Sequence, residues 1–391
     1  MVLVDQVGAS VGRGWSAVAV VAAATFTVVT SEMLPVGLLS PIGASLGVTE
    51  GTAGLALTVT GLSAAAAAPS LAPLFARHDR RRLLCLLMAL VGAGNLLSAW
   101  APGFAVLTAA RLLVGVGMGG VWALAAGIAV RLVAAKSVGT ATSLVFSGIA
   151  VASVLGVPAG AYVGELLGWR AAFVAAGILG LGVAAALAAV LPPLPPEDAR
   201  PRLTEPLAEG RVRVALAVVA LLVTGHFAAY TYVRPVLEEV SGVRSGLVGA
   251  LLLVYGVAGI AGNFAAGYGA TRSARGTLLV LASLLSVTVV LVPALGDSTA
   301  AAAGLLVLWG IAYGGVSVSV QTWLLAAVPH AREAASALLV AVFNIAIAAG
   351  AFAGGRIADG RGAASVMYLG GALAAAAAAT LAVTRRRTTD T

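Results

Sequence analysis

The chain has 391 residues, of which 60% are hydrophobic and only 10% are charged. Soluble globular domains carry about 25% charged residues, so this composition predicts a membrane protein with several spans and leaves no room for a soluble domain. The net charge of +8 does not require nucleic acid, because arginines also collect at the cytoplasmic ends of membrane spans. The lone Cys85 excludes an internal disulfide, and three scattered histidines do not form a metal pattern.

Twelve apolar runs of the length that a bilayer requires, about 20 residues, follow one another along the chain. They are predicted at 15–40, 51–74, 83–101, 104–131, 139–163, 170–191, 214–237, 246–270, 277–295, 300–326, 335–356 and 363–383. The first run is too long for the apolar part of a signal peptide, so we expect it to be a retained span. Short connections such as 101–103 predict hairpins between antiparallel neighbours.

The longest connection, 192–213, is rich in proline and charge and separates six spans from six. It predicts an N-terminal six-helix bundle at 1–191, a cytoplasmic linker at 192–213 and a C-terminal six-helix bundle at 214–391. Seventeen of the 23 lysines and arginines lie in one set of loops and termini, and five lie in the other set. This asymmetry predicts that both termini and the linker are cytoplasmic.

Two opposite charges are predicted at matching depth inside the first and fourth spans. Glu32 is the only acidic residue placed well inside a span, roughly 12 Å from its outer end, and Arg111 lies roughly 10 Å deep in the fourth span. Charged residues within a span are rare and are usually functional. We hypothesise that Glu32 gains and loses a proton during transport, and that the charge of Arg111 tunes this protonation. The alternative is a static ion pair that fixes the two spans together.

Several spans and loops contain recognisable motifs. They are EMLPVGLL from Glu32, the loop arginines Arg77, Arg80 and Arg81, Arg111-x3-Gly115-x-Gly117, the run containing Gly156, Pro158 and Gly160, FAAYTYVRP from Phe227, and Trp309-Gly with Gln321-Thr-Trp323. These motifs resemble those of the major facilitator superfamily, and within it the twelve-span drug:proton antiporters and the bacterial purine-ribonucleoside, sugar and arabinose efflux permeases. The halves also repeat, since Arg77 and Arg80 match Arg272 and Arg275 at an offset of 195 residues. The resemblance implies an all-α fold of two pseudo-symmetric six-helix bundles around a central cavity.

The resemblance implies gating residues, and the small residues of the fifth span lead to a pivot hypothesis. The loop after the second span would gate the transporter through Arg77, Arg80 and Arg81, with Asp79 supplying the carboxylate because alanines occupy the family's Gly and Asp positions. Gly156, Pro158 and Gly160 would let the fifth span press against the glycine-rich eighth span and pivot there. Simple close packing is the alternative role for the same glycines.

Aromatic and polar residues predicted in cavity-lining spans are the candidates for substrate binding. These residues are Trp122, His226, Phe227, Tyr230, Trp309, Tyr313, Gln321, Trp323 and Asn344. Stacked aromatic rings with an amide at their polar edge would suit a nucleoside or an aromatic drug. Such aromatics also pack against lipid, and His226 could instead be hydrogen-bonded to a neighbouring helix.

The sequence therefore predicts a transporter rather than an enzyme: a proton-coupled efflux antiporter of drug-, antibiotic- or nucleoside-like molecules, working by alternating access. No Gly-Lys-Ser/Thr phosphate loop is present, so ATP is not expected as the energy source, and no cofactor is expected. We expect a monomer in a bacterial cytoplasmic membrane. One alternative is sugar efflux or proton-independent facilitated transport, and another is a membrane sensor or assembly partner without turnover.

Overall fold

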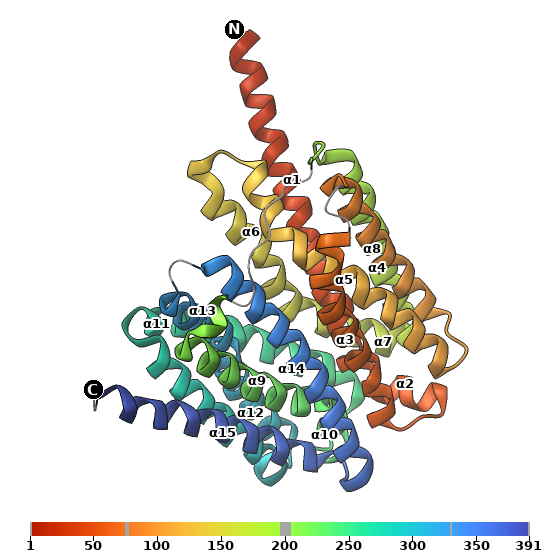
Figure 1. Ribbon diagram of the computed structural model, residues 1–391. Helices are drawn as coiled ribbons and strands as arrows, with labels where there is room; N and C mark the ends of the chain where they lie inside the picture. Colours follow the sequence, from red (N-terminus) through yellow and green to blue (C-terminus); the bar gives the residue numbers. More distant parts are fainter. Residues whose placement is uncertain (1, 75–77, 196–204, 329–330, 390–391) are drawn as a thin grey trace. The chain divides into compact units, whose positions relative to one another are not determined.

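The computed structural model describes residues 2–74, 78–195, 205–328 and 331–389, and within these ranges the regular structure is entirely helical (Figure 1). The first half contains α1 (Val2–Met33), α2 (Leu39–Leu46), α3 (Glu50–Leu74), α4 (Arg80–Ala99), α5 (Phe104–Leu132), α6 (Val138–Val151), α7 (Val157–Leu167) and α8 (Trp169–Val190). The second half contains α9 (Gly210–Tyr230), α10 (Val233–Glu239), α11 (Ser245–Leu295), α12 (Thr299–Gly314), α13 (Val316–Ala327), α14 (Arg332–Arg361) and α15 (Ala364–Thr389).

The described helices supply the predicted apolar spans. Eleven helical segments are long and apolar enough to cross a bilayer. The longest, α11, contains a non-helical residue, Ser273 (φ −158°, ψ 89°), so it comprises two spans joined by a kink. With α11 counted as two spans, the described residues contain the twelve spans that the sequence predicts, and the all-helical membrane fold is confirmed.

The first, fifth and tenth spans are each interrupted within the membrane-spanning run. The first span changes to a 3-10 helix at Leu34–Leu38, where Pro35 has no N–H to donate. The fifth span carries a π-helical turn at Ala152–Gly156, just before Pro158. The tenth span breaks at Gly315, between α12 and α13. Such breaks leave backbone groups that other helices must satisfy.

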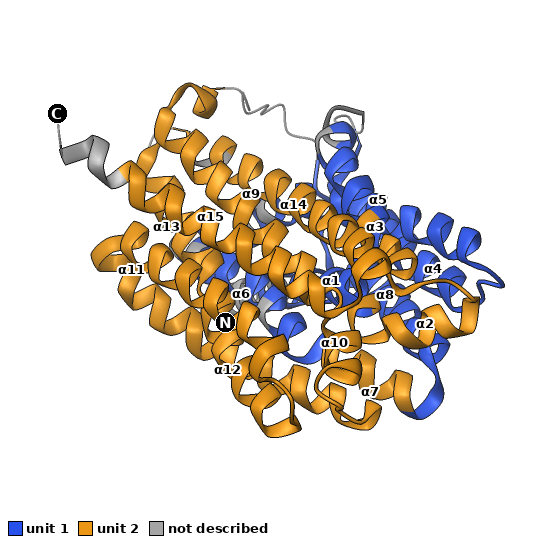
Figure 2. Cartoon of the chain, turned by 90° about the horizontal axis from the view of Figure 1, so that it is seen from below, with its two compact units in different colours: residues 1–34, 59–156, 166–199 blue, residues 35–58, 157–165, 200–391 orange. Residues whose placement is uncertain are grey.

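The chain divides into two compact units, which Figure 2 shows in blue and orange. The first consists of residues 1–34, 59–156 and 166–199, and the second of residues 35–58, 157–165 and 200–391. The second unit therefore includes short segments from the first half of the chain. The predicted division into two bundles of six consecutive spans stays a prediction.

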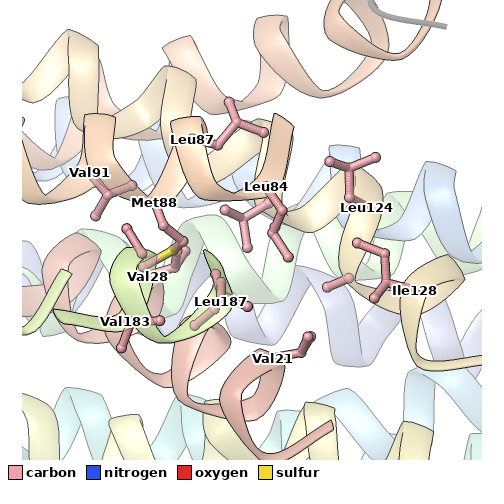
Figure 3. Packing of buried hydrophobic residues seen from close by; sticks show 14 of the residues in the cluster. Val21, Val28, Leu84, Leu87, Met88, Val91, Leu124, Ile128, Val183 and Leu187 are labelled. Carbon is pink, nitrogen blue, oxygen red and sulfur yellow. The ribbon is translucent and has the colours of Figure 1, made fainter. Parts of the chain in front are cut away.

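The first unit has a hydrophobic core formed by α1, α4, α5 and α8, with smaller contributions from α3 and α6 (Figure 3). Side chains spaced four or seven residues apart lie on one helix face. The paired positions are Val21 with Val28 on α1, Leu84 with Met88 on α4, Leu124 with Ile128 on α5, and Val183 with Leu187 on α8. This core holds α1 in contact with α5, the helix that carries the arginine predicted to act with Glu32.

Glycines in the second unit bring α11 and α12 close together. A Cβ added at Gly262 would overlap the Ile311 carbonyl oxygen, and one added at Gly314 would overlap the Gly259 carbonyl oxygen. The expectation that the glycines of the eighth span face the fifth span is therefore wrong for Gly259 and Gly262. Gly249 does face that span, because its added Cβ would lie 3.3 Å from the Pro158 carbonyl oxygen.

Candidate functional site

Glu32 occupies the last turn of α1, directly before the break at Pro35. Its side chain is 4% exposed, and it is the only buried carboxylate among the acidic residues whose burial the structure describes. Within that part of the chain, its Oε1 atom has no hydrogen-bond partner. A charged group buried without a partner is costly, so Glu32 stands apart from the other acidic residues of the protein.

Arg111, on α5, is completely buried and is bound to the end of α1 (0% exposed). Its Nη2 atom donates to the Ser31 carbonyl oxygen at 2.8 Å and to the Glu32 carbonyl oxygen at 3.4 Å. Its Nε atom donates to the Thr60 hydroxyl of α3 at 3.0 Å. The predicted meeting of Glu32 and Arg111 thus occurs through the backbone of Glu32, and the salt bridges found among the described residues do not include this pair.

Further side chains of the first unit complete the surroundings of Arg111. The Phe173 ring lies 5.8 Å from the guanidinium carbon, within the range of a cation–π contact. Asn95 on α4 donates to the Ser31 hydroxyl at 2.9 Å. Three atoms near this network, the Arg111 Nη1, the Asn95 Oδ1 and the Glu32 Oε1, are buried with no partner in the described part of the chain. The end of α1 is therefore held by hydrogen bonds from α4 and α5, while the Glu32 Oε1 atom has no partner among the described residues.

A second group of predicted residues forms an aromatic cluster in the second unit, centred on His226. Its members are His226, Phe227 and Tyr230 from α9, Tyr255 from α11, and Trp309 and Tyr313 from α12. His226 is stacked on Tyr313 with an interplanar angle of 5° and on Tyr230 with an angle of 19°. The rings on α9 and α12 meet because positions four residues apart share one helix face. Five of the nine predicted substrate residues are thus brought together.

Hydrogen bonds fix the protonation of His226 in this structure. The Trp309 Nε1 donates to the His226 Nδ1 at 3.0 Å, and the Tyr255 hydroxyl lies 3.5 Å from the His226 Nε2. An indole nitrogen can only donate, so the Nδ1 atom carries no proton and the neutral ring carries its proton on Nε2. The side chains of His226 and Trp309 are 1% and 0% exposed. His226 is therefore a neutral bridge between aromatic neighbours here.

The remaining predicted substrate residues lie outside this cluster. Gln321 is exposed and Trp323 is half-buried, both on α13. The Asn344 amide donates to the Val340 carbonyl oxygen of its own helix at 2.9 Å. Trp122, in the first unit, is half-buried and stacks on Phe146 with an interplanar angle of 14°. Their roles in substrate binding stay predictions.

The predicted gating loop contains a helix cap. Asp79 accepts from the backbone N–H groups of Arg81 at 2.8 Å and Arg82 at 3.3 Å, which makes it the N-cap of α4. It also accepts from the Leu194 N–H at 3.1 Å, and the Arg80 N–H donates to the Leu194 carbonyl oxygen at 2.8 Å. The Arg81 guanidinium donates to the Ala188 carbonyl oxygen of α8. Arg77 lies outside the described residues.

The predicted pivot residues are all buried, in two different settings. A Cβ added at Gly156 would lie 2.5 Å from the Thr30 hydroxyl oxygen of α1, so this glycine permits close packing within the first unit. Pro158 and Gly160 are buried in α7, in the second unit. These contacts fit the close-packing alternative, and the pivot role stays a prediction.

Thr60, Tyr255 and Arg234 also lie at these contacts, although the sequence did not mark them as site residues. Thr60 binds Arg111, Tyr255 joins the aromatic cluster, and Arg234 binds the Gly37 carbonyl oxygen at 2.8 Å, Glu238 at 3.0 Å and Glu165 at 3.5 Å. Only Arg234 carried a signal in the sequence, since an arginine next to a proline at the end of an apolar span is unusual. A threonine or a tyrosine in a span is too common to single out.

Comparisons with known proteins identify the family. The model of the Major Facilitator Superfamily matches residues 21–351. The chain belongs to the Major Facilitator Superfamily. Members of this superfamily are transporters, so the predicted transporter class is confirmed and an enzyme is excluded.

Two kinds of relatives support this assignment. The purine ribonucleoside efflux pumps NepI of Salmonella typhimurium and Salmonella typhi are each 32% identical to this chain over 361 residues, covering 92% of this chain and 91% of theirs. A crystal structure of a bacterial homologue of the human lysosomal transporter Spinster, in an inward-facing and occupied conformation, superposes with a TM-score of 0.78. It is 18% identical and the match covers 96% of this chain and 97% of the other, so it supports the major facilitator fold alone.

Proposed function

We propose that this protein exports purine nucleosides, or planar polar molecules of similar size, in exchange for protons across a bacterial cytoplasmic membrane. The observation that carries the substrate class is the 32% identity, over 92% of the chain, to transporters named as purine ribonucleoside efflux pumps. The earlier expectations of both termini in the cytoplasm and of a monomer form part of the proposal.

The aromatic cluster supports this substrate class. A purine base is flat and binds well between aromatic rings, and each stacked base contributes about 1–3 kcal/mol. Tyr313 is half-buried, whereas the other five rings of the cluster are buried. We therefore assign the outer face of Tyr313 as the stacking surface, with the rings behind it keeping it in place.

Glu32 is the group that we assign to proton exchange. Its carboxyl group is buried and its Oε1 atom lacks a hydrogen-bond partner in the described part of the chain. A carboxyl group in such surroundings is buried at lower cost when it is protonated. It would release its proton when a conformational change brings water or a polar substrate to it. This cycle would couple the gain and loss of a proton at Glu32 to the transport of a substrate.

The test is transport into inverted membrane vesicles that contain the protein. A proton gradient, acidic inside, should drive uptake of radiolabelled inosine, and a protonophore should abolish that uptake. Glu32→Gln keeps the size of the side chain but cannot exchange a proton, so gradient-driven uptake should be lost while inosine still equilibrates down its own gradient. Gradient-driven accumulation by Glu32→Gln would exclude Glu32 as the proton carrier.

The alternative functions predict other results in the same vesicles. Inosine or sugar movement that is unaffected by the protonophore would indicate facilitated transport without protons. No movement of any compound in a nucleoside, sugar and drug panel, by protein that is folded and inserted, would favour the sensor or assembly role.

A further inference from the structure

The end of α1 contains a backbone carbonyl group that its own helix cannot satisfy. In a continuous α-helix the carbonyl of residue 31 accepts from the N–H of residue 35. Residue 35 is a proline, which has no N–H, and the chain changes to a 3-10 helix at Leu34–Leu38. A buried carbonyl without a donor is unfavourable within a membrane. Because of Pro35, the Ser31 carbonyl oxygen needs a hydrogen-bond donor from another helix.

Arg111 is this donor. Its Nη2 atom lies 2.8 Å from the Ser31 carbonyl oxygen and 3.4 Å from the next one, that of Glu32. Its Nε atom is occupied by Thr60, whose hydroxyl group lies 3.4 Å from the Arg111 carbonyl oxygen in return. Two of the three guanidinium nitrogens, Nε and Nη2, thus bind uncharged acceptors, and Nη1 has no partner among the described residues. The arrangement places a positive charge beside Glu32 without an ion pair between the two side chains.

We propose that Pro35 and Arg111 act together to keep the Glu32 carboxyl group free of an ion pair, with Arg111 as a positioning residue that caps the broken helix. This proposal rests on the proposed function, in which Glu32 exchanges protons. A guanidinium bound directly to the carboxylate would hold it ionised through the cycle. Because Pro35 leaves the Ser31 carbonyl oxygen as a neutral acceptor for Arg111, the arginine orders the end of α1 and leaves the acid able to gain and lose its proton.

The test measures the protonation of Glu32 without any transport. Dicyclohexylcarbodiimide reacts with protonated carboxyl groups in apolar surroundings, and peptide mass spectrometry gives the fraction of Glu32 modified at each pH in purified protein in nanodiscs. Four proteins form a double-mutant cycle: the native chain, Pro35→Ala, Arg111→Gln and the double variant. Pro35→Ala restores the N–H that binds the Ser31 carbonyl, so it releases Arg111 to the carboxylate.

We expect Pro35→Ala to shift the pH profile of labelling and to lower the labelling of Glu32 at a fixed pH about tenfold, the effect of an opposite charge in direct contact. Adding Arg111→Gln to Pro35→Ala should restore that labelling about tenfold. Arg111→Gln in the native chain should change it by less than about threefold, because a nearby charge is lost there but no ion pair is broken. An equal effect of Arg111→Gln in both backgrounds would overturn the proposal.

Each protein is first checked for a single gel-filtration peak and native helix content. Pro35→Ser, which also restores the N–H, replaces Pro35→Ala should the latter not fold. The Arg111→Gln protein is decisive by itself as well, since a tenfold gain of labelling in the native background would mean that the ion pair exists. If the native chain shows no inosine transport, the proposed function is contradicted, but these labelling results are unaffected.

Discussion

The hydrogen bond between Trp309 and His226 gives the sharpest test of the aromatic cluster. Trp309→Phe keeps an aromatic ring in place but removes the indole N–H, which lies 3.0 Å from the His226 Nδ1. Both side chains are buried, so the Nδ1 atom would have no water to replace its donor. Stranding a buried acceptor costs about 1–3 kcal/mol, and the smaller ring adds a cavity cost of about 1 kcal/mol. We expect the free energy of unfolding to fall by about 2–4 kcal/mol.

His226→Phe separates the lost hydrogen bond from the lost volume. Alone, it strands the indole N–H and should also be destabilising. In the Trp309→Phe background it removes the stranded acceptor, and replacing both partners by apolar rings is far less costly than removing one. The double variant should therefore be more stable than the sum of the single effects predicts, by about 1–2 kcal/mol.

The assay is unfolding in mixed micelles titrated with sodium dodecyl sulfate, followed by circular dichroism so that the loss of a tryptophan does not alter the signal. Tyr255→Phe is the matched control, because it removes the weaker 3.5 Å contact to the other nitrogen of the same ring. It should cost less than half as much as Trp309→Phe. Additive single effects, within about 0.5 kcal/mol, would refute the neutral, hydrogen-bonded state of His226.

Three further predictions use other parts of the chain. Tyr313→Ala should raise the KM for inosine about tenfold or more, since stacking contributes about 1–3 kcal/mol. Tyr313→Phe should change this KM less than about threefold. A KM for Tyr313→Ala equal to that of the native chain in vesicle uptake would remove Tyr313 from the site. Gly262→Ala should destabilise the protein by about 1–3 kcal/mol through overlap with the α12 backbone. Gly267 lies on the same helix, and a Cβ added there would have no atom within 4 Å, so Gly267→Ala should be neutral or stabilising by up to about 1 kcal/mol. The opposite order of stabilities in detergent unfolding would contradict the packing. Arg234→Gln should lower the free energy of unfolding by about 2–3 kcal/mol because the arginine is buried. Glu165→Gln should lower it by under about 1 kcal/mol because that carboxylate is 37% exposed. Similar losses for the two variants in the same titration would argue against this ranking.

The sequence by itself determined the class of protein, the spans and the family. An apolar run long enough to cross a bilayer can be recognised from composition, because the bilayer excludes polar residues over a fixed thickness. Glu32 and Arg111 could be singled out for the same reason, since a charge within a span is expensive and therefore rare. The pairs four residues apart, His226 with Tyr230 and Trp309 with Tyr313, were also predictable as shared helix faces.

Only the tertiary structure decided which atoms these residues bind. Whether Arg111 reaches a carboxylate or a carbonyl depends on the rotation of α5 against α1 and on the presence of Thr60, both of which involve distant parts of the chain. Pro35 is visible in the sequence, but the partner of the carbonyl that it leaves free is not. The same holds for Gly262, whose small size serves α12 and not the fifth span. Span length and polarity are local properties, whereas the facing of helices depends on how all neighbouring side chains pack together.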